Sequence, residues 1–551
     1  MKRKLFLALV ALMMIPMLFT SCGKKEEAVE TAVEEAAPAG PVVMNWNLAA
    51  DPKYIDPGLN GASDGGDLAS NLFEGLVRER SGEVIPGIAK SWETSDDGLV
   101  VTFHLRESKW SDGSPLTAHD FVYSWKRAIE PSTASEYGWI WHYTNVVNAE
   151  AANNGEVSVD EVGIRAVDDL TFEVTLSAPT DYFVSLTSFY HFMPVKQSSI
   201  EDANGGDGMW MKTPSLAVSN GAYKLTSYKV GDGLTLEKNE NYWNTSKTGL
   251  DIINVKFIDS ASTGYTAYQA GEFDFLDGSS VPPAEIPALV AENPEFYVFP
   301  LLGTYYYNFN MDLDMWSDSR VRRALSYAID RTLIVETLGR GNVPAGGFVP
   351  PGFPDHEGND FFETAGTYGI SMDAGSVEEA KKLLAEAGYP NGEGFPKFTL
   401  MYNTSEGHQL VAEMVQEMWK TNLGISCDLE NQEWAVFQDT RKAGDYQVSR
   451  GGWITDFLDP MGLLAIFVDG NDYNDPNYNN PAYNEAMAKA SSSNGAAHYE
   501  ALYAAQDILM KDMPIVPVYH YTDYFLSSPK LKGWDRSMLG QIDFTTAYLA
   551  D

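Results

Sequence analysis

Two side chains of opposite charge stand six positions apart in the stretch of residues 450–460. Arg450 and Asp456 are separated mainly by two glycines and a tryptophan, residue types that favour a close-packed setting. A guanidinium group can hold a carboxylate, and a carboxylate can hold an ammonium group. The pair is therefore suited to a zwitterionic ligand, although an internal salt bridge between the two side chains would use the same residues.

The first residues of the chain predict an exported protein. Three basic residues at positions 2–4 precede an apolar run, Leu5 to Phe19, which leads through small residues into Cys22. The run is shorter than the stretch of about 20 residues that spans a bilayer. We expect residues 1–21 to be a bacterial lipoprotein signal and Cys22 to carry the lipid; the alternative is an ordinary cleavable signal with an incidental cysteine.

The segment that starts at Cys22 is acidic, rich in alanine and free of aromatic residues. Because it offers too little apolar surface to offset the entropy cost of ordering, we expect a flexible tether over residues 22–41. Each buried acyl CH₂ group contributes about 0.8 kcal/mol, so several chains on one cysteine would anchor the protein firmly. The predicted location is the cell envelope, on a membrane and facing the periplasm or the cell exterior.

Composition excludes one class of partner and bounds the size of the fold. The formal net charge of the 551 residues is −39, so no basic face could attract nucleic acid against that field. With Cys22 lipidated, Cys427 is the only remaining cysteine, and no internal disulfide is expected. The length of the chain suggests about three domains, and a hydrophobic content of 44% suffices for their cores.

The hydrophobic pattern is that of a mixed α and β protein. Apolar and polar residues alternate over residues 99–105 and 170–176, which predicts half-buried strands. A capping box from Ser376 to Glu379 predicts the start of a helix that ends at Gly388.

Two apolar stripes predict further helices in the second half of the chain. One stripe runs from Leu410 to Met418 and ends near Gly424, and a strand is predicted over residues 425–429. The other stripe lies in the stretch of residues 320–338. Helices followed by strands in this way predict an α/β lobe around a central sheet.

Several segments agree in order and spacing with one known family. The longest is residues 103–125, and the others are 305–310, 318–325, 402–405 with His408, 430–434, 450–460 and 515–519. They resemble the bacterial oligopeptide-binding proteins that serve ABC transporters, which form family 5 of the solute-binding proteins. The resemblance covers nearly all of the chain after the tether.

The resemblance implies an α/β fold of three domains, the class II periplasmic-binding-protein fold, in which two lobes close on a cleft and one domain is extra. Domain I is expected to be discontinuous (residues 42–73, 198–302 and 525–551), domain II to span residues 74–197 and domain III residues 303–524. The implied function is to capture extended peptides of about two to five residues, largely independent of their sequence. A monomer would then deliver them to the permease subunits of an ABC importer.

The resemblance also implies roles for single residues. Asp456 is expected to hold the α-ammonium group of the peptide, and Arg450, Arg441 and His408 its C-terminal carboxylate at different peptide lengths. Gly452 is expected to pair with the peptide backbone, as an added strand does. The positions expected to line side-chain pockets are Trp434, Trp453, Tyr137, Tyr306, Asn403 and Tyr521. Hydrated pockets suit varied side chains, because water adapts where fixed groups cannot.

The chain departs from the family pattern at several positions. Gly303 and Ile454 stand where some members carry a disulfide beside the cleft. Gly61 and Gly339 stand where some members carry a carboxylate and a lysine, and Arg340 follows the second glycine. The preferred peptide length is therefore open.

Other interpretations stay open at this point. Asp277 stands where some members carry an aromatic residue; it could favour a basic ligand side chain or be an ordinary loop carboxylate. Receptors related to this family take other solutes, such as oligosaccharides, dipeptides, murein peptides or nickel chelates, and an added adhesive or chaperone-like role is compatible with the sequence. We expect no enzyme, cofactor or metal site, because Ser405 with His408 is not a credible catalytic dyad and the histidines do not cluster at metal-ligand spacing.

Overall fold

The computed structural model describes residues 40–203, 208–372 and 376–550. The predicted signal, Cys22 and the predicted tether up to residue 39 lie outside these residues. The architecture below is that of the unit Pro41–Asp551. Within the described ranges, no helix combines the length and the apolar character needed to cross a membrane.

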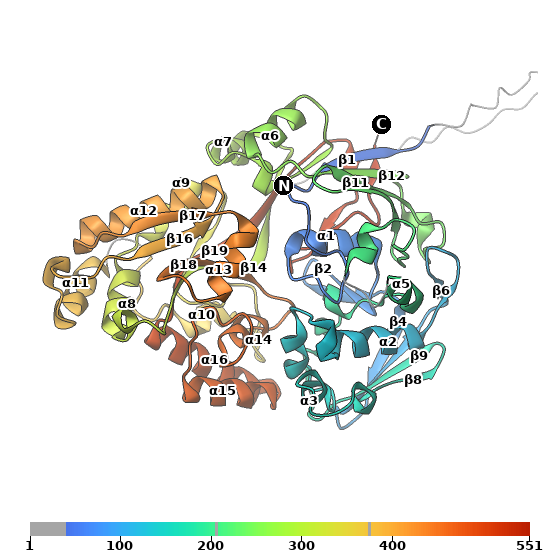
Figure 1. Ribbon diagram of the computed structural model, residues 1–551, viewed down its shortest axis with the longest axis horizontal. Coiled ribbons are helices and arrows are strands. Elements are labelled where there is room, and N and C mark those ends of the chain that lie inside the picture. The colour runs from blue at the N-terminus through green and yellow to red at the C-terminus, as the bar shows by residue number, and fades with distance from the viewer. Residues whose placement is uncertain (1–39, 204–207, 373–375, 551) are drawn as a thin grey trace, which may run out of the picture. The chain divides into compact units, whose positions relative to one another are not determined.

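An eleven-stranded sheet is the central element of the fold. Strand pairs β1–β12, β1–β13, β16–β17 and β16–β18 are parallel and the others are antiparallel. The strands run in the order β10 (Tyr223–Lys229), β11 (Gly233–Lys238), β12 (Ile252–Lys256), β1 (Val43–Asn47), β13 (Phe275–Asp277), β19 (Ile515–Ser527), β14 (Phe296–Phe309), β18 (Val448–Ile454), β16 (Thr399–Asn403) and β17 (Asp428–Gln432), and β15 (Val343–Pro344) pairs with β19 (Figure 1).

Two long strands, β14 and β19, connect the halves of this sheet. The first part of β14 pairs with the last part of β19, next to β13. Its second part lies between β19 and β18. Regular pairing is interrupted between Pro300 and Thr304, so the two halves are joined through a short irregular stretch of two strands.

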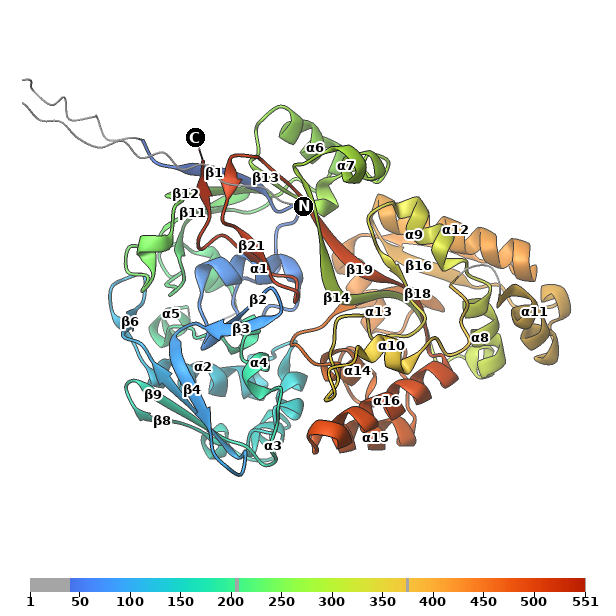
Figure 2. The same ribbon diagram turned by 180° about the vertical axis from the view of Figure 1, so that it is seen from behind.

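A separate four-stranded antiparallel sheet has the order β4 (Ala89–Thr94), β5 (Val100–Leu105), β9 (Thr171–Thr175) and β8 (Ile164–Asp168). The strands predicted at 99–105 and 170–176 are confirmed, with Val101 and Phe103 buried on one face of β5. Helix α2 (Ala118–Ile129) covers this face, and its Trp125 ring lies 4.9 Å from that of Phe172 (Figure 2). Short two-stranded pairs are β2 (Val77–Arg80) with β3 (Glu83–Pro86), β6 (Ser108–Lys109) with β7 (Pro115–Leu116), β20 (Leu531–Lys532) with β23 (Tyr548–Leu549) and β21 (Asp535–Arg536) with β22 (Ile542–Asp543).

The remaining helices border both sheets. Those before β14 are α1 (Ser63–Leu72), α3 (Ala149–Asn153), α4 (Phe183–Leu186), α5 (Gln197–Asp202), α6 (Ala261–Gln269) and α7 (Ile286–Glu292). Those after it are α8 (Ser319–Tyr327), α9 (Arg331–Leu338), α10 (Phe361–Ala365), α11 (Val377–Glu386), α12 (Glu406–Leu423), α13 (Trp434–Lys442), α14 (Met461–Leu464), α15 (Pro481–Ser491) and α16 (Gly495–Asp512). In both views α9 and α12 lie beside the β16 end of the large sheet.

The predicted helix at residues 320–338 is in fact two helices. The chain leaves α8 after Tyr327, and α9 starts at Arg331. Asp330 accepts a hydrogen bond from Leu333 N–H at 2.8 Å and so caps a new helix, which the continuous apolar stripe did not reveal.

Two other predicted details are also corrected. The strand predicted at 425–429 begins later, as β17, because its parallel register with β16 starts at Asp428. The helix predicted from Ser376 is present as α11, but the capping box is not formed: Ser376 Oγ instead accepts a hydrogen bond from Ser371 N–H at 2.8 Å. The helix that ends at Gly424 is confirmed as α12, and Gly424 has a left-handed φ of 70°.

Candidate ligand-binding site

Strand β18 has an open edge beside the predicted charge pair. It pairs with β14 along its whole length, but with β16 only through its first two residues. Neighbouring residues of a strand direct their backbone groups to opposite sides. Thr455 N–H, just beyond the strand, donates to a carbonyl of β14, so the backbone groups of Arg450, Gly452 and Ile454 point away from β14. Among the described residues no strand pairs with this edge, which can therefore accept an extended peptide by strand addition.

Glycine at position 452 is required by its neighbours. A Cβ atom there would lie 2.2 Å from Tyr521 Oη and 2.8 Å from Arg450 Nη2. These two side chains form a hydrogen bond of 2.8 Å, in which the guanidinium donates. Gly452 thus lets a bonded Arg–Tyr pair lie against the strand.

Asp456 is a buried carboxylate that has no cationic partner in the part of the chain that the structure describes. It is 3% exposed; its Oδ1 accepts a hydrogen bond of 3.1 Å from Tyr137 Oη, whereas its buried Oδ2 has no partner among the described residues. Burial raises the pKa of Asp456 well above its ordinary value, and the hydrogen bond from Tyr137 offsets only part of this. An ammonium group at Oδ2 would satisfy both the charge and the free oxygen.

Tyr137, which holds this carboxylate, belongs to a cluster of four aromatic rings. The rings of Tyr137, Trp139, Trp453 and Tyr473 lie between 4.7 and 6.4 Å from one another, measured between centroids. Ring faces attract cations, and an apolar wall strengthens the attraction between an ammonium group and a carboxylate. Tyr137 and Trp453 were predicted to line a pocket, whereas nothing in the sequence pattern singled out Trp139 and Tyr473.

Arg450 likewise forms no ion pair with any carboxylate of the described residues. Its Cζ lies 5.1 Å from the ring centroid of Tyr305, Nη2 donates to Tyr521, and the buried Nε has no hydrogen-bond partner among the described residues. The alternative of an internal salt bridge between Arg450 and Asp456 is not observed: within the described ranges neither forms an ion pair.

His408 lies close to Arg450. It is in the first turn of α12, and its ring centroid is 5.6 Å from that of Tyr305, on which Arg450 also stacks. Burial, together with the charges of Arg450 and Arg340, holds the pKa of His408 well below its ordinary value. The imidazole is therefore neutral in the free protein, and an approaching carboxylate would raise its pKa and favour uptake of a proton.

Arg441, by contrast, is already paired. Its Nε lies 3.0 Å from Asp475 Oδ2, and both side chains are buried. Its Nη1 also donates to the carbonyl oxygen of Arg450 at 3.5 Å. This arrangement suits a side chain that supports Arg450 better than one that binds a second carboxylate.

The remaining predicted pocket residues differ in their surroundings. Asn403 ends β16, and its buried Oδ1 has no partner among the described residues. Tyr306 is 2% exposed and packs edge-on against Phe348 and Phe467, as a core residue does. Trp434 is 38% exposed at the start of α13.

The positions where the chain departs from the family pattern can now be placed. Gly303 lies directly opposite Ile454 in the β14–β18 register, as positions that carry a cross-strand disulfide would. A Cβ atom at Gly61 would meet Glu136 Oε2 at 2.5 Å, so the carboxylate of Glu136 fills that space. Asp277 accepts hydrogen bonds from Ser279 N–H and Oγ–H at 2.9 and 2.7 Å, which is the role of a local cap.

Other reactive residue types offer no second site. Cys427 is buried, and burial with the nearby Asp428 raises its thiol pKa to about 12, so it is unreactive at neutral pH. In the described part of the chain no group of three or more His, Cys, Asp or Glu side chains could hold a metal ion.

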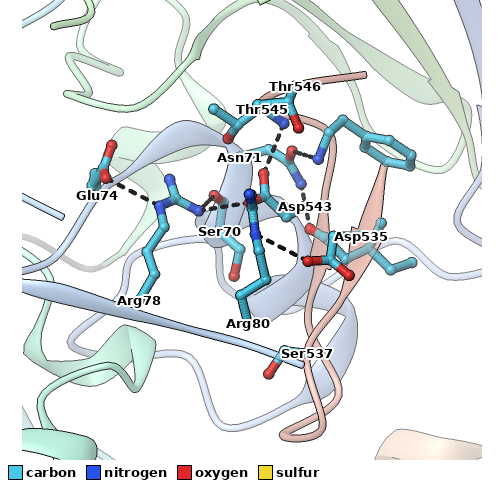
Figure 3. Close-up of polar contacts among 12 residues, drawn as sticks. Ser70, Asn71, Glu74, Arg78, Arg80, Asp535, Ser537, Asp543, Thr545 and Thr546 are labelled. Carbon is cyan, nitrogen blue, oxygen red and sulfur yellow. Dashed lines mark hydrogen bonds and ion pairs between the residues drawn. The ribbon is translucent and has the colours of Figure 1, made fainter. Parts of the chain in front are cut away.

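A second cluster of buried charges, shown in Figure 3, is balanced internally. Arg78 contacts Glu74 at 3.2 Å and Asp543 at 3.4 Å, and Arg80 contacts Asp535 at 3.0 Å and Asp543 at 2.5 Å. The cluster joins β2 to the C-terminal segment. Every cation in it has carboxylate partners, which is the arrangement of a structural network, whereas the charges of Asp456 and Arg450 are unpaired.

Comparison with known proteins gives a consistent result. Residues 83–475 match the family model described as bacterial extracellular solute-binding proteins, family 5, middle. The oligopeptide-binding protein OppA of Bacillus subtilis is 36% identical over 525 residues, which cover 92% of this chain and 93% of that protein. The crystal structure of Haemophilus influenzae OppA in complex with the peptide RPPGFSPFR is 35% identical, covers 93% of this chain and 100% of its own, and has a TM-score of 0.84.

The structural similarity differs between a peptide-bound relative and an unliganded one. An unliganded open form of the periplasmic murein tripeptide-binding protein MppA covers 93% of this chain and 98% of its own at 36% identity, yet its TM-score is 0.66. Since identity and coverage hardly differ from those of the OppA complex, the lower score reflects a different arrangement of the same elements. The chain, with its mixed α/β fold around a large sheet, belongs to family 5 of the bacterial extracellular solute-binding proteins.

Proposed function

We propose that the chain is the peptide receptor of an ABC importer, which encloses short extended peptides and delivers them to the permease. The observation that carries this is the open edge of β18 with an unpaired buried carboxylate beyond one end and an unpaired guanidinium at the other. A peptide presents an ammonium group, a backbone and a carboxylate in the same order. Relatives named as oligopeptide-binding proteins along nearly the whole chain support this proposal.

The proposed roles follow from the surroundings of each residue. Asp456 binds the α-ammonium group, and Tyr137 orients it. The edge at Gly452 pairs with the peptide backbone, and Arg450 with His408 meets the C-terminal carboxylate. Of the predicted pocket residues, Trp453, Asn403 and Tyr521 have the most favourable positions, while Arg441, Tyr306 and Trp434 remain predictions.

The domain boundaries given above are part of the proposal. Opening and closing would take place where β14 and β19 cross between the halves of the sheet, and the irregular stretch between Pro300 and Thr304 is our candidate for the hinge. We further propose a monomer that has no catalytic activity and is held on the membrane by lipid on Cys22.

Blocking the ligand's ammonium group tests the proposal. Isothermal titration calorimetry with free peptides of two to five residues should detect binding. The N-acetylated forms should bind at least about 30-fold more weakly, because the buried carboxylate of Asp456 loses its cationic partner at a cost of about 2 kcal/mol or more.

Controls separate the alternatives. C-terminally amidated peptides test the guanidinium end independently, and cellobiose and a nickel chelate test the other solute classes. Equal binding of free and acetylated peptides would show that the ammonium site is wrongly assigned, and binding of a sugar or chelate alone would replace the proposed function.

A further inference from the structure

The cationic end of the site contains more positive charge than one peptide carboxylate requires. Besides Arg450, it holds Arg340, which the sequence pattern marked only as the neighbour of Gly339. Arg340 Nη1 donates to Tyr524 Oη at 2.6 Å, and its Cζ lies 5.2 Å from the same ring. Its Nε is buried and has no hydrogen-bond partner among the described residues.

Both guanidinium groups lie near His408. Arg340 Nη2 would lie 3.3 Å from a Cβ atom on Gly407, so its head group lies against the first turn of α12 beside His408. Arg450 lies near His408 through Tyr305, whose ring contacts both side chains. Both arginine charges lower the pKa of His408, which agrees with their closeness.

The backbone fixes Arg340 in this place. Gly339 ends α9 in a left-handed conformation, with φ of 64°, which turns the chain out of the helix. The carbonyl oxygen of Arg340 then accepts a hydrogen bond of 2.7 Å from Thr522 Oγ1 of β19. Two residues of β19 thus hold Arg340: Thr522 binds its backbone and Tyr524 binds its guanidinium group. The side chain is therefore not a mobile surface group.

Nearby carboxylates do not neutralise this pair. Glu406 is exposed, and Asp277 caps the turn at Ser279. Within the described ranges, neither Arg340 nor Arg450 lies within 4.0 Å of any carboxylate. Arg331 shows what a structural buried arginine of this chain looks like, because its guanidinium donates to three carbonyl oxygens and one hydroxyl.

We propose, on the basis of the proposed peptide function, that the site selects peptides with a second carboxylate near their C-terminus, such as those that end in Glu or Asp. Asp456 takes the single ammonium group, and the two carboxylates are divided between Arg450 and Arg340. Such a ligand carries one positive and two negative charges, which complement the one unpaired carboxylate and two unpaired guanidiniums. Because the whole chain has a net charge of −39, long-range attraction cannot produce this preference, and short contacts must.

Matched peptides test the selectivity. Dissociation constants are measured by calorimetry for Ala-Ala-Glu against Ala-Ala-Gln, and for the tetrapeptides Ala-Ala-Ala-Glu against Ala-Ala-Ala-Gln. The glutamate peptide of at least one length should bind about tenfold tighter or more, the factor that one charge-assisted hydrogen bond contributes. Equal affinities at both lengths would overturn the inference while the proposed function stands, and failure of all four peptides to bind would count against the proposed function itself.

Variants assign the preference to Arg340. In Arg340→Met the ratio between glutamate and glutamine peptides should fall to near one while the glutamine peptides keep their affinity within about threefold; Arg340→Lys should retain part of the ratio. Arg323→Met is the control, because Arg323 also donates to a tyrosine hydroxyl, that of Tyr327 at 2.9 Å, with its Cζ 5.4 Å from that ring. An unchanged ratio in folded Arg340→Met would overturn the role of Arg340.

Discussion

Asp456→Asn is expected to reduce peptide affinity by roughly 30- to several-thousand-fold, which corresponds to the cost of about 2–5 kcal/mol for removing one partner of a buried charged contact. The same substitution should leave the free protein as stable as the wild type, or more stable. The reason is that the Asp456 carboxylate is buried, has one unbonded oxygen and has no cation to offset its desolvation in the described structure. Calorimetric titration and urea unfolding measure the two quantities.

A second carboxylate, Asp475, provides a control for which we expect the opposite effect on the stability of the free protein. The side chain of Asp475 is 5% exposed and forms an ion pair with Arg441 at 3.0 Å. Asp475→Asn should therefore destabilise the protein, by about 3–5 kcal/mol if the pair behaves as buried pairs usually do. If Asp456→Asn left peptide affinity unchanged, or destabilised the protein as much as Asp475→Asn, Asp456 would be a structural residue.

The pH dependence of binding follows from the same carboxyl group. Burial raises the pKa of Asp456 in the free protein, and a bound ammonium group must lower it. The carboxyl group of Asp456 therefore binds fewer protons in the complex than in the free protein, so its contribution to the affinity is complete above its free-protein pKa and is lost as the pH falls through that value. Because His408 can take up a proton in both proteins, the test is the difference: titrations in buffers of different ionisation enthalpy should show that the wild type releases more protons on binding, or takes up fewer, than Asp456→Asn.

Short-range patterns in the sequence predicted the elements well, and side-chain partnerships poorly. The alternation in β5 and the stripe of α12 are recorded in neighbouring residues, so both elements were found. The break between α8 and α9 was missed because Asp330 acts as a cap only through its hydrogen bond to the following turn, while the apolar stripe continues through it.

In the candidate site, too, the sequence revealed residues that are close in the chain more readily than contacts between distant elements. Arg450 and Asp456 were found because one short segment carries both, and the register that places Gly303 opposite Ile454 agrees with the positions assigned to a disulfide. In contrast, Arg340 and His408 belong to different elements, and only the folded chain brings them together. The partner of Arg441, Asp475, lies on a loop that the sequence pattern does not connect with α13.

Asp543→Asn is expected to lower the free energy of unfolding by about 1.5–3 kcal/mol, the contribution of a hydrogen bond to a charged group, because Arg78 keeps Glu74 and Arg80 keeps Asp535 as partners. Asp543 is the shared carboxylate of Arg78 and Arg80 in the network of Figure 3, which ties the C-terminal segment to β2. Urea unfolding measures the loss. The peptide affinity of the folded protein should stay unchanged, because the network is separate from the Asp456 and Arg450 contacts.

The control for this prediction is a carboxylate that also contacts two cationic side chains but is more exposed to solvent. Asp232 contacts Lys229 and Lys256, both at 3.0 Å, and its side chain is 44% exposed, so Asp232→Asn should lower the free energy of unfolding much less than Asp543→Asn. Burial alone would raise the pKa of Asp543, but Arg78 and Arg80 together bring it below its ordinary value. Its contribution is therefore complete above the unfolded-state pKa and is lost as the pH falls through the lower folded-state value. The difference in free energy of unfolding between wild type and Asp543→Asn should therefore disappear in acid. If this difference were constant with pH, or no larger than the one for Asp232→Asn, the network would not hold the C-terminal segment through charge.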